Sequence, residues 1–345
     1  MRSNKNQIRT FQIKIVKQRR RRKEYERRRN LARNDKRYTV VHRSAPSGKR
    51  KFDIVQVPEY FSFEQNLEAL IEFTNKTYKK YKDFRYGHLF FYMSQVIELD
   101  MPAICLLLSL LNKLTWKQIS YAGNAPDNPT AFEVFIKSGF LEMMKSRGFK
   151  LKPPTIPNQL YMIGQNDLKP QVIGESIKKA MKVVVGEYTH FKPLYSIMIE
   201  ICTNSVEHAN DPVNEKNWLV SISYEEGRAN FILVDSGQGI LKTLHRKARE
   251  LFADILSFKS QSKVLQGLFD KKYQSRTKEI NRHKGMPRVK QAYVDGFICG
   301  LEVLTNKVYY KFDNDEAITL DNEYHGTLFK WSIDVNNYKK WKKEF

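Results

Sequence analysis

Between residues 52 and 148, stretches with the hydrophobic pattern of a strand alternate with stretches that have the pattern of a helix. Strand-like runs lie in FDIVQVPEYF, which ends near Pro58, and in HLFFYMSQVIELD and WKQISYAGNAP. A helix-like run follows each of them, in NLEALIEFTNKTYKKY, AICLLLSLLNKL and PTAFEVFIKSGFLEMM. Strands that alternate with helices over about 100 residues predict a small α/β domain.

A second α/β unit is predicted over residues 171–345, after a Pro-rich linker that we place at 149–170. Its predicted helices lie near 173–186, 193–209 and 288–295, and its predicted strands are WLVSISYEE, NFILVDS, LEVLTNKVYYKF and GTLFKWSID. A long basic insertion, residues 241–284, interrupts the unit.

The positive charge is concentrated at the N-terminus. The chain carries a net charge of +23, and residues 1–51 hold 20 Lys and Arg against three acidic residues. With few apolar side chains to bury, this arm is expected to be disordered or a solvated helix in the isolated protein. It is either an arm that binds a polyanion, by releasing counterions from phosphates, or a solubilising tail. We expect the former, with nucleic acid or a ribonucleoprotein as the partner.

Neither a membrane span nor a disulfide framework is predicted. The longest apolar run, PAICLLLSLL at 102–111, falls short of the roughly 20 residues that a span requires. Cys105, Cys202 and Cys299 lie far apart, each in an apolar setting. We therefore expect a cytoplasmic protein with reduced cysteines and no contact with a membrane.

Three segments of the second unit carry polar or glycine residues at positions where a binding site could form: one face of a helix, the end of one strand and the start of another. Glu200, Asn204 and His208 lie at i, i+4 and i+8 of a predicted helix and share one face. The segment ILVDSGQGI leads Asp235 into a glycine turn, and HGTLFKW opens the last strand. Taken alone, each has a plain structural explanation, as a solvated helix face or as turn chemistry.

Together and in this order, these segments resemble the GHKL ATP-binding family over residues 171–335. The resemblance implies an α/β sandwich in which a mixed sheet is covered by helices. It also implies that Asn204 ligates a Mg²⁺ bridging the ATP phosphates and that Glu200 is the general base. Hard oxygen ligands suit Mg²⁺, and one helical turn separates the two tasks by about 5 to 6 Å.

The same resemblance assigns the nucleotide-binding residues. Asp235 would accept a hydrogen bond from the adenine amino group, Gly237 and Gly239 would let the backbone approach the nucleotide, and Thr327 would support the adenine side. The family's GxGLxxxK element is imperfect, because HKGMPRVKQ places Gly285 and Lys290 in register but has His283 where the first glycine belongs. The insertion at 241–290, with 14 Lys and Arg against four acidic residues, fits either a lid over the triphosphate or an extended basic surface.

The helix motif TNSVEHA most resembles the anti-sigma-factor serine kinase branch, whose targets are STAS-domain proteins. Residues 52–148 are similar to a STAS domain, which would precede the ATP-binding domain here and follow the basic arm. The match departs at Asp100-Met101-Pro102-Ala103, where the family has phosphoacceptor serines. Self-phosphorylation is therefore not expected, and the STAS-like domain is predicted to dock a protein partner or to regulate. His208 is assigned no catalytic role.

Two main functions and one lesser alternative remain open from the sequence. One is a Mg²⁺-dependent enzyme, either a slow ATPase or a partner-directed kinase, that uses Glu200 as its base. The other is an ATP-gated switch with little turnover, in which the STAS-like domain and the basic arm hold the partner. The imperfect glycine turn favours the switch, and the presence of Glu200 favours the enzyme. A nucleic-acid-binding protein without a nucleotide is a third alternative.

Overall fold

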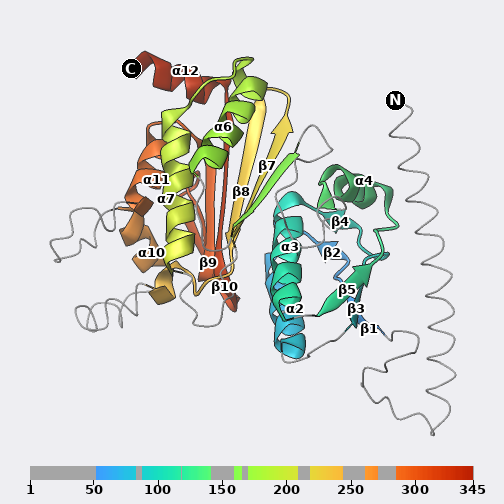
Figure 1. Ribbon diagram of the computed structural model, residues 1–345. Coiled ribbons are helices and arrows are strands. Elements are labelled where there is room, and N and C mark those ends of the chain that lie inside the picture. Colours follow the sequence, from blue (N-terminus) through green and yellow to red (C-terminus); the bar gives the residue numbers. More distant parts are fainter. Residues whose placement is uncertain are drawn as a thin grey trace, which may run out of the picture.

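The computed structural model describes residues 52–82, 88–117, 119–140, 159–164, 170–208, 218–243, 261–270 and 285–344. The basic arm at 1–51, His283 and most of the basic insertion lie outside these ranges. The chain is mixed α/β, with one parallel and one antiparallel major sheet (Figure 1). In the described ranges, no helix combines the length and the apolar character that a membrane crossing requires.

The N-terminal domain contains the predicted alternation of strands and helices. Its parallel sheet has the order β1-β3-β5, and β2 and β4 form a separate parallel pair. The run HLFFYMSQVIELD, predicted as one strand, is divided between β3 and β4. The elements are β1 (Asp53–Gln56), β2 (Tyr60–Phe61), α2 (Leu67–Tyr81), β3 (His88–Tyr92), β4 (Glu98–Leu99), α3 (Met101–Trp116), β5 (Ser120–Gly123) and α4 (Pro129–Lys137).

The C-terminal domain is built on a five-stranded sheet with the order β6-β7-β8-β10-β9. Its strands are β6 (Gln159–Gly164), β7 (Trp218–Glu225), β8 (Arg228–Asp235), β9 (Cys299–Lys311) and β10 (Glu316–Asp334). Its helices are α6 (Pro170–Val185), α7 (Lys192–His208), α10 (Gln261–Phe269), α11 (Gly285–Val294) and α12 (Val335–Glu344).

Two predictions for this domain need correction. Every neighbouring pair of strands in the described part of this domain is antiparallel, so the mixed sheet that was expected is wrong there. Short hairpins that reverse the chain explain two of the four pairs, since β7 leads directly to β8 and β9 to β10. The range assigned to the linker also contains β6, which pairs with β7 at the edge of the sheet.

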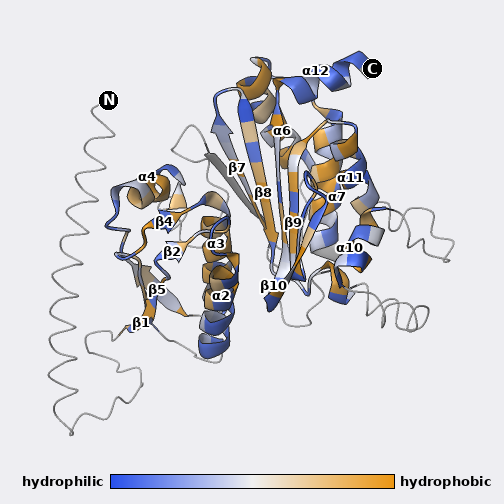
Figure 2. Cartoon of the chain, turned by 180° about the vertical axis from the view of Figure 1, so that it is seen from behind, coloured by the Kyte–Doolittle hydropathy of each residue, from blue (hydrophilic) through white to orange (hydrophobic). Residues whose placement is uncertain are grey.

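Helix α3 explains how the two domains meet. Its sequence MPAICLLLSLLNKLTW is apolar around almost its whole circumference, and residues 102–112 are all buried. A helix of this kind must be covered on more than one side. Here α3 contacts β5 of its own domain and also β7 and β8 of the C-terminal sheet. Figure 2 shows its hydrophobic colouring next to that sheet.

The C-terminal sheet is therefore covered on both faces (Figure 1). Helices α6, α7, α10, α11 and α12 share one apolar core with one face, and α2 and α3 cover the other. Each buried Leu or Ile at such a contact stabilises the fold by about 1.5–3 kcal/mol. Polar contacts fix the register of the two domains: the Glu68 carboxylate accepts from the backbone N of Asp321 (2.7 Å) and Asn322 (3.1 Å).

Candidate functional site

Helix α7 places the predicted polar row beside the end of the sheet. Its buried face, which includes Leu194, Ile197 and Ile201, packs into the core of the C-terminal domain. Glu200 and Asn204 are partly buried and lie one turn apart at the margin of that face. His208 is the last residue of α7, and its side chain lies outside the described part of the structure.

Asp235, the last residue of β8, joins three elements through its carboxylate. Oδ1 accepts from the backbone N of Gly237 at 2.8 Å and from that of Thr327 at 3.2 Å. Oδ2 accepts from Ser205 Oγ of α7 at 3.4 Å. Thr327 lies directly opposite Asp235 in the β8–β10 ladder, which explains why a residue 92 positions away meets this carboxylate.

Burial sets the electrostatic character of Asp235. Its residue surface is only 8% exposed, and burial raises the pKa of the carboxyl, while the bonds from Gly237, Thr327 and Ser205 oppose that shift. The bond from Ser205 is long, and a carboxylate oxygen can accept more than one hydrogen bond. The Thr327 hydroxyl is a further donor, but the single Ser205 proton is shared with the Ile201 carbonyl at 3.1 Å. Asp235 therefore retains the capacity to accept from a ligand.

Gly239 is required by the shape of the turn after Asp235. Its φ is +82°, a conformation that side chains disfavour, and a Cβ there would lie 2.5 Å from Asn306 Oδ1. Asn306 in turn donates to the carbonyl of Gln238 at 2.9 Å and accepts from the N of Leu241 at 3.1 Å. Asn306 of β9 thus holds the turn through two hydrogen bonds, and Gly239 lets the backbone of the turn pack directly against Asn306.

Glu200 meets the start of α11. Gly285 packs so closely on it that a Cβ at residue 285 would overlap Glu200 Oε1. Arg288 Nη1 lies 3.3 Å from Glu200 Oε2 and donates a hydrogen bond to it. The Glu200 carboxylate thus lies at the N-terminal end of α11 and is paired with an arginine.

Lys290 does not point toward Glu200 or Asn204 in this conformation. Its Nζ donates to Asp270 Oδ1, the residue that follows α10, at 2.5 Å. The structure therefore brings Asp235, Gly237, Gly239 and Thr327 together, brings Glu200 to Gly285, and leaves Lys290 engaged elsewhere. Asn204 lies one turn beyond Glu200, and among the described residues its amide has no hydrogen-bond partner.

Four residues of the site were not found from the sequence: Ser205, Thr305, Asn306 and Tyr324. Tyr324 OH donates to the Asp235 carbonyl at 3.2 Å, and Thr305 Oγ1 accepts from the N of Ile240 at 2.9 Å. A signal did exist for one of them. Asn306 interrupts a β-branched and aromatic run, its φ is +52°, and the β9–β10 register shifts beside it, as expected at a bulge.

Within the described ranges, no three His, Cys, Asp or Glu side chains gather around a point that could hold a metal ion. An Asn-ligated Mg²⁺ would not require such a cluster, because this ion keeps several waters and takes phosphate oxygens as ligands. The partly buried Asn204 amide, next to the helical turn that carries Glu200, has the chemistry of a single protein ligand.

No protein-family model matches the chain, and a search of curated proteins finds no similar sequence. The functional assignment therefore depends on the residues of the site.

Proposed function

We propose that the C-terminal domain binds Mg-ATP in the manner of the GHKL family and acts as a regulatory module. The observation that supports this most is the Asp235 carboxylate, which is buried, bonded to the glycine turn, β10 and α7, and still able to accept a hydrogen bond. A buried carboxylate with spare acceptor capacity costs stability unless a ligand uses it. A purine amino group is a donor of the right kind.

In this proposal each residue has one task. Asp235 accepts from the adenine amino group, while Gly237 and Gly239 allow the nucleotide to approach the backbone. Asn204 is the protein ligand of Mg²⁺, which neutralises charge on the phosphates when bound. Glu200 takes a proton from a water or a substrate hydroxyl, which requires its carboxylate to lie within hydrogen-bond reach of that oxygen.

The contacts of Glu200 favour a second candidate function, an ATP-gated switch with little turnover. A base that is paired with Arg288 and covered by Gly285 is not free to take a proton. Lys290, bound to Asp270, is likewise withdrawn from the position of a phosphate contact. The Asp235 turn also reaches the N-terminal domain, since Ser236 Oγ and Ser109 Oγ share a hydrogen bond of 2.9 Å. Through this hydrogen bond, a change in the turn on nucleotide binding would reach α3 of the N-terminal domain, which we propose binds the partner.

The partners remain predictions. We propose that residues 1–51 contact a nucleic acid or a ribonucleoprotein and that the STAS-like domain offers a protein-binding surface. Because α2 and α3 already cover the C-terminal sheet, that surface would have to lie on another part of the domain.

Calorimetric titration with ATP and Mg²⁺ tests the binding proposal. Wild type is expected to bind, and Asp235→Ala to bind about ten- to hundredfold more weakly, because a charged acceptor contributes about 1.5–3 kcal/mol. Asp321→Ala, which removes an exposed carboxylate from the same strand as Thr327, serves as the control and should bind as wild type does. Absence of heat for wild type, or equal affinity for Asp235→Ala, would contradict the proposal.

Phosphate release separates the enzyme from the switch. Glu200→Gln keeps the size of the side chain but removes the base, so an ATPase should lose about 100-fold or more in rate with nucleotide affinity retained. Equal trace rates in wild type and Glu200→Gln would identify the switch.

A further inference from the structure

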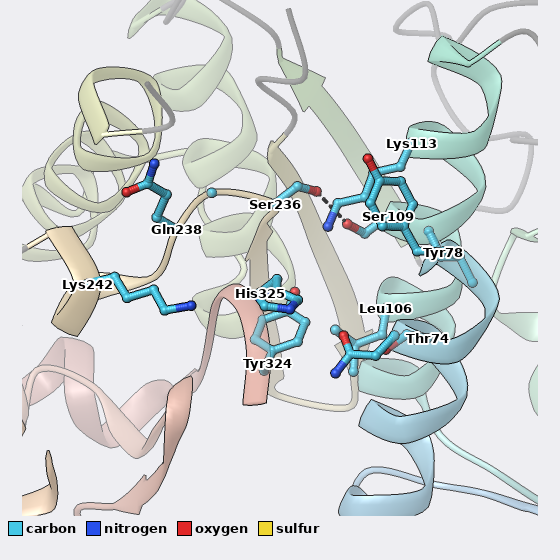
Figure 3. A pocket seen from close by; sticks show the side chains of 13 residues that line it. Thr74, Tyr78, Leu106, Ser109, Lys113, Ser236, Gln238, Lys242, Tyr324 and His325 are labelled. Carbon is cyan, nitrogen blue, oxygen red and sulfur yellow. Dashed lines mark hydrogen bonds between the residues drawn. The ribbon is translucent and has the colours of Figure 1, made fainter. Parts of the chain in front are cut away.

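A cavity of about 380 Å³ lies between the two domains. Helices α2 and α3 form one wall, and the turn after Asp235 together with β10 forms the other (Figure 3). Pockets of about 300–1,000 Å³ are of the size that holds small organic ligands. This cavity is therefore large enough for a ring with an attached functional group.

The cavity lies on the opposite face of the sheet from α7. Asp235 directs its carboxylate toward Ser205 of α7, whereas the next residue, Ser236, bonds Ser109 of α3. Successive residues of an extended chain point to opposite faces. The turn thus lies between the proposed nucleotide site and this cavity, and Gly237 borders both.

The polar part of the lining is basic. Lys113 from α3 and Lys242 from the C-terminal domain extend toward the cavity from opposite walls (Figure 3). None of the residues that line it in the described structure is acidic. Glu323 pairs with Lys242 at 2.8 Å from outside the lining and is also held by Asn306 at 3.1 Å. An ammonium group has three donors, so Lys242 can bind Glu323 and an anion together.

Hydroxyl and apolar groups make up most of the remaining lining of the cavity. Ser109 and Ser236 lie on the side of Lys113 in Figure 3, and Tyr78, Leu106 and Tyr324 supply an apolar wall. His325 also lines the cavity; burial lowers its pKa, and Lys242 and Lys113 lower it further against the opposing effect of Glu323. At neutral pH His325 is therefore an uncharged donor or acceptor rather than a third cation.

We propose that this interdomain cavity, lined by Lys113, Lys242, Ser109 and Ser236 and walled by Tyr78 and Tyr324, binds a small aromatic anion. The acidic group, a phosphate monoester or a carboxylate, lies between the two lysines, and the ring lies against the tyrosines. Because its two walls come from different domains, the ligand bridges them. The site requires no nucleotide on the other face of the sheet.

Ligand-detected NMR titration of the full chain tests the site, with phenyl phosphate and benzoate as probes and benzyl alcohol as their uncharged counterpart. At least one anion should bind with a dissociation constant on the order of 0.1–1 mM, as expected for a probe of this size, and the alcohol about tenfold or more weakly. Whichever anion binds better identifies the acidic group. Failure of both anions to bind, or equal binding of the alcohol, overturns the proposal.

The double variant Lys113→Met/Lys242→Met keeps the aliphatic stems and should weaken binding of the better anion at least tenfold. Lys179→Met removes an exposed lysine from α6, across the sheet, and should leave binding unchanged. Equal loss in both variants, or in neither, overturns the proposal.

Hydrogen exchange of wild type gives a readout that does not depend on any variant. The bound anion should protect amides of α2, α3 and the segment 236–242, on both walls of the cavity. Segment 236–242 borders both sites, so α2 and α3 decide between them. Protection of α7, α11 or segment 236–242 without α2 and α3 would place the anion in the proposed nucleotide site and overturn the assignment.

Discussion

Asp100 follows β4 in the N-terminal domain and Asp235 ends β8 in the C-terminal domain, and the two domains use these carboxylates in opposite ways. Asp100 is saturated: Oδ2 accepts from Ser62 Oγ (2.7 Å) and from the N of Phe63 (2.6 Å) and Glu64 (3.1 Å), and Oδ1 caps α3 at Ala103 (2.8 Å). Asp235 is buried and is less completely bonded, because the single proton of the Ser205 hydroxyl is shared between the Ile201 carbonyl (3.1 Å) and Asp235 Oδ2 (3.4 Å). A carboxylate whose acceptors are filled by its own chain is structural, and one with capacity left is available to a ligand.

Replacing each aspartate by asparagine tests the difference between a fully bonded carboxylate and one with spare capacity. Asp100→Asn should change the free energy of unfolding most. At residue 100 both oxygens face N–H donors, so an amide NH₂ must oppose one of them. The expected loss is about 2–3 kcal/mol, or about 3–4 °C in thermal midpoint for a chain of this size. Thermal unfolding checks this, with Glu59→Gln, an exposed carboxylate just before β2, as the unchanged control. A midpoint equal to wild type would show that the cap is dispensable.

Asp235→Asn should instead stabilise the ligand-free protein at neutral pH by about 1 kcal/mol, since it removes a buried charge while Oδ1 still accepts from Gly237 and Thr327. Burial raises the pKa of Asp235 in the folded state, so the folded wild type takes up a proton more readily than the unfolded chain as pH falls. The advantage of asparagine should therefore narrow as pH falls through the folded pKa. Urea unfolding between neutral pH and pH 4 measures it, and an advantage that widens in acid would contradict the assignment.

Arg288→Ala removes the ion-pair partner of Glu200, the proposed base. Of the three substitutions it should change the free energy of unfolding least. The Arg288 side chain is mostly exposed, so its pairing with Glu200 is worth less than about 1 kcal/mol. If the pair restrains Glu200, phosphate release should rise about two- to fivefold, with ATP affinity little changed. Lys263→Ala, on α10, is a control for a lost surface cation. A rate that falls in Arg288→Ala would mean that the arginine assists turnover instead.

The sequence predicted those features that depend on local pattern. Helical spacing placed Glu200 and Asn204 on α7, and the strand-to-glycine transition placed Asp235 at the end of β8. Thr327 was found because a resemblance named it, and the ladder of β8 and β10 brings it to Asp235.

The remaining features depend on contacts that no local pattern carries. Asn306 and Tyr324 reach the Asp235 turn from distant strands, and β6 lay hidden inside the Pro-rich range. Helix α12, VNNYKKWKKE, was not predicted because most of its residues are polar. Asp334 caps it, accepting from the N of Asn336 at 2.8 Å. The docking of α3 on the C-terminal sheet, which creates the cavity, could only be seen once both domains were folded together.

The covering of the C-terminal sheet from both sides limits how this chain can be divided in the laboratory. On the face toward α2 and α3, the sheet carries Leu219, Ile232, Val234, Leu304 and Leu328, all buried in one cluster with residues of the N-terminal domain. A fragment that begins at β6 would present this apolar surface to water and self-associate. The two halves are therefore better produced together. If the chain were cut between them and the halves reassembled, the folding of each domain could be followed through its binding to the other.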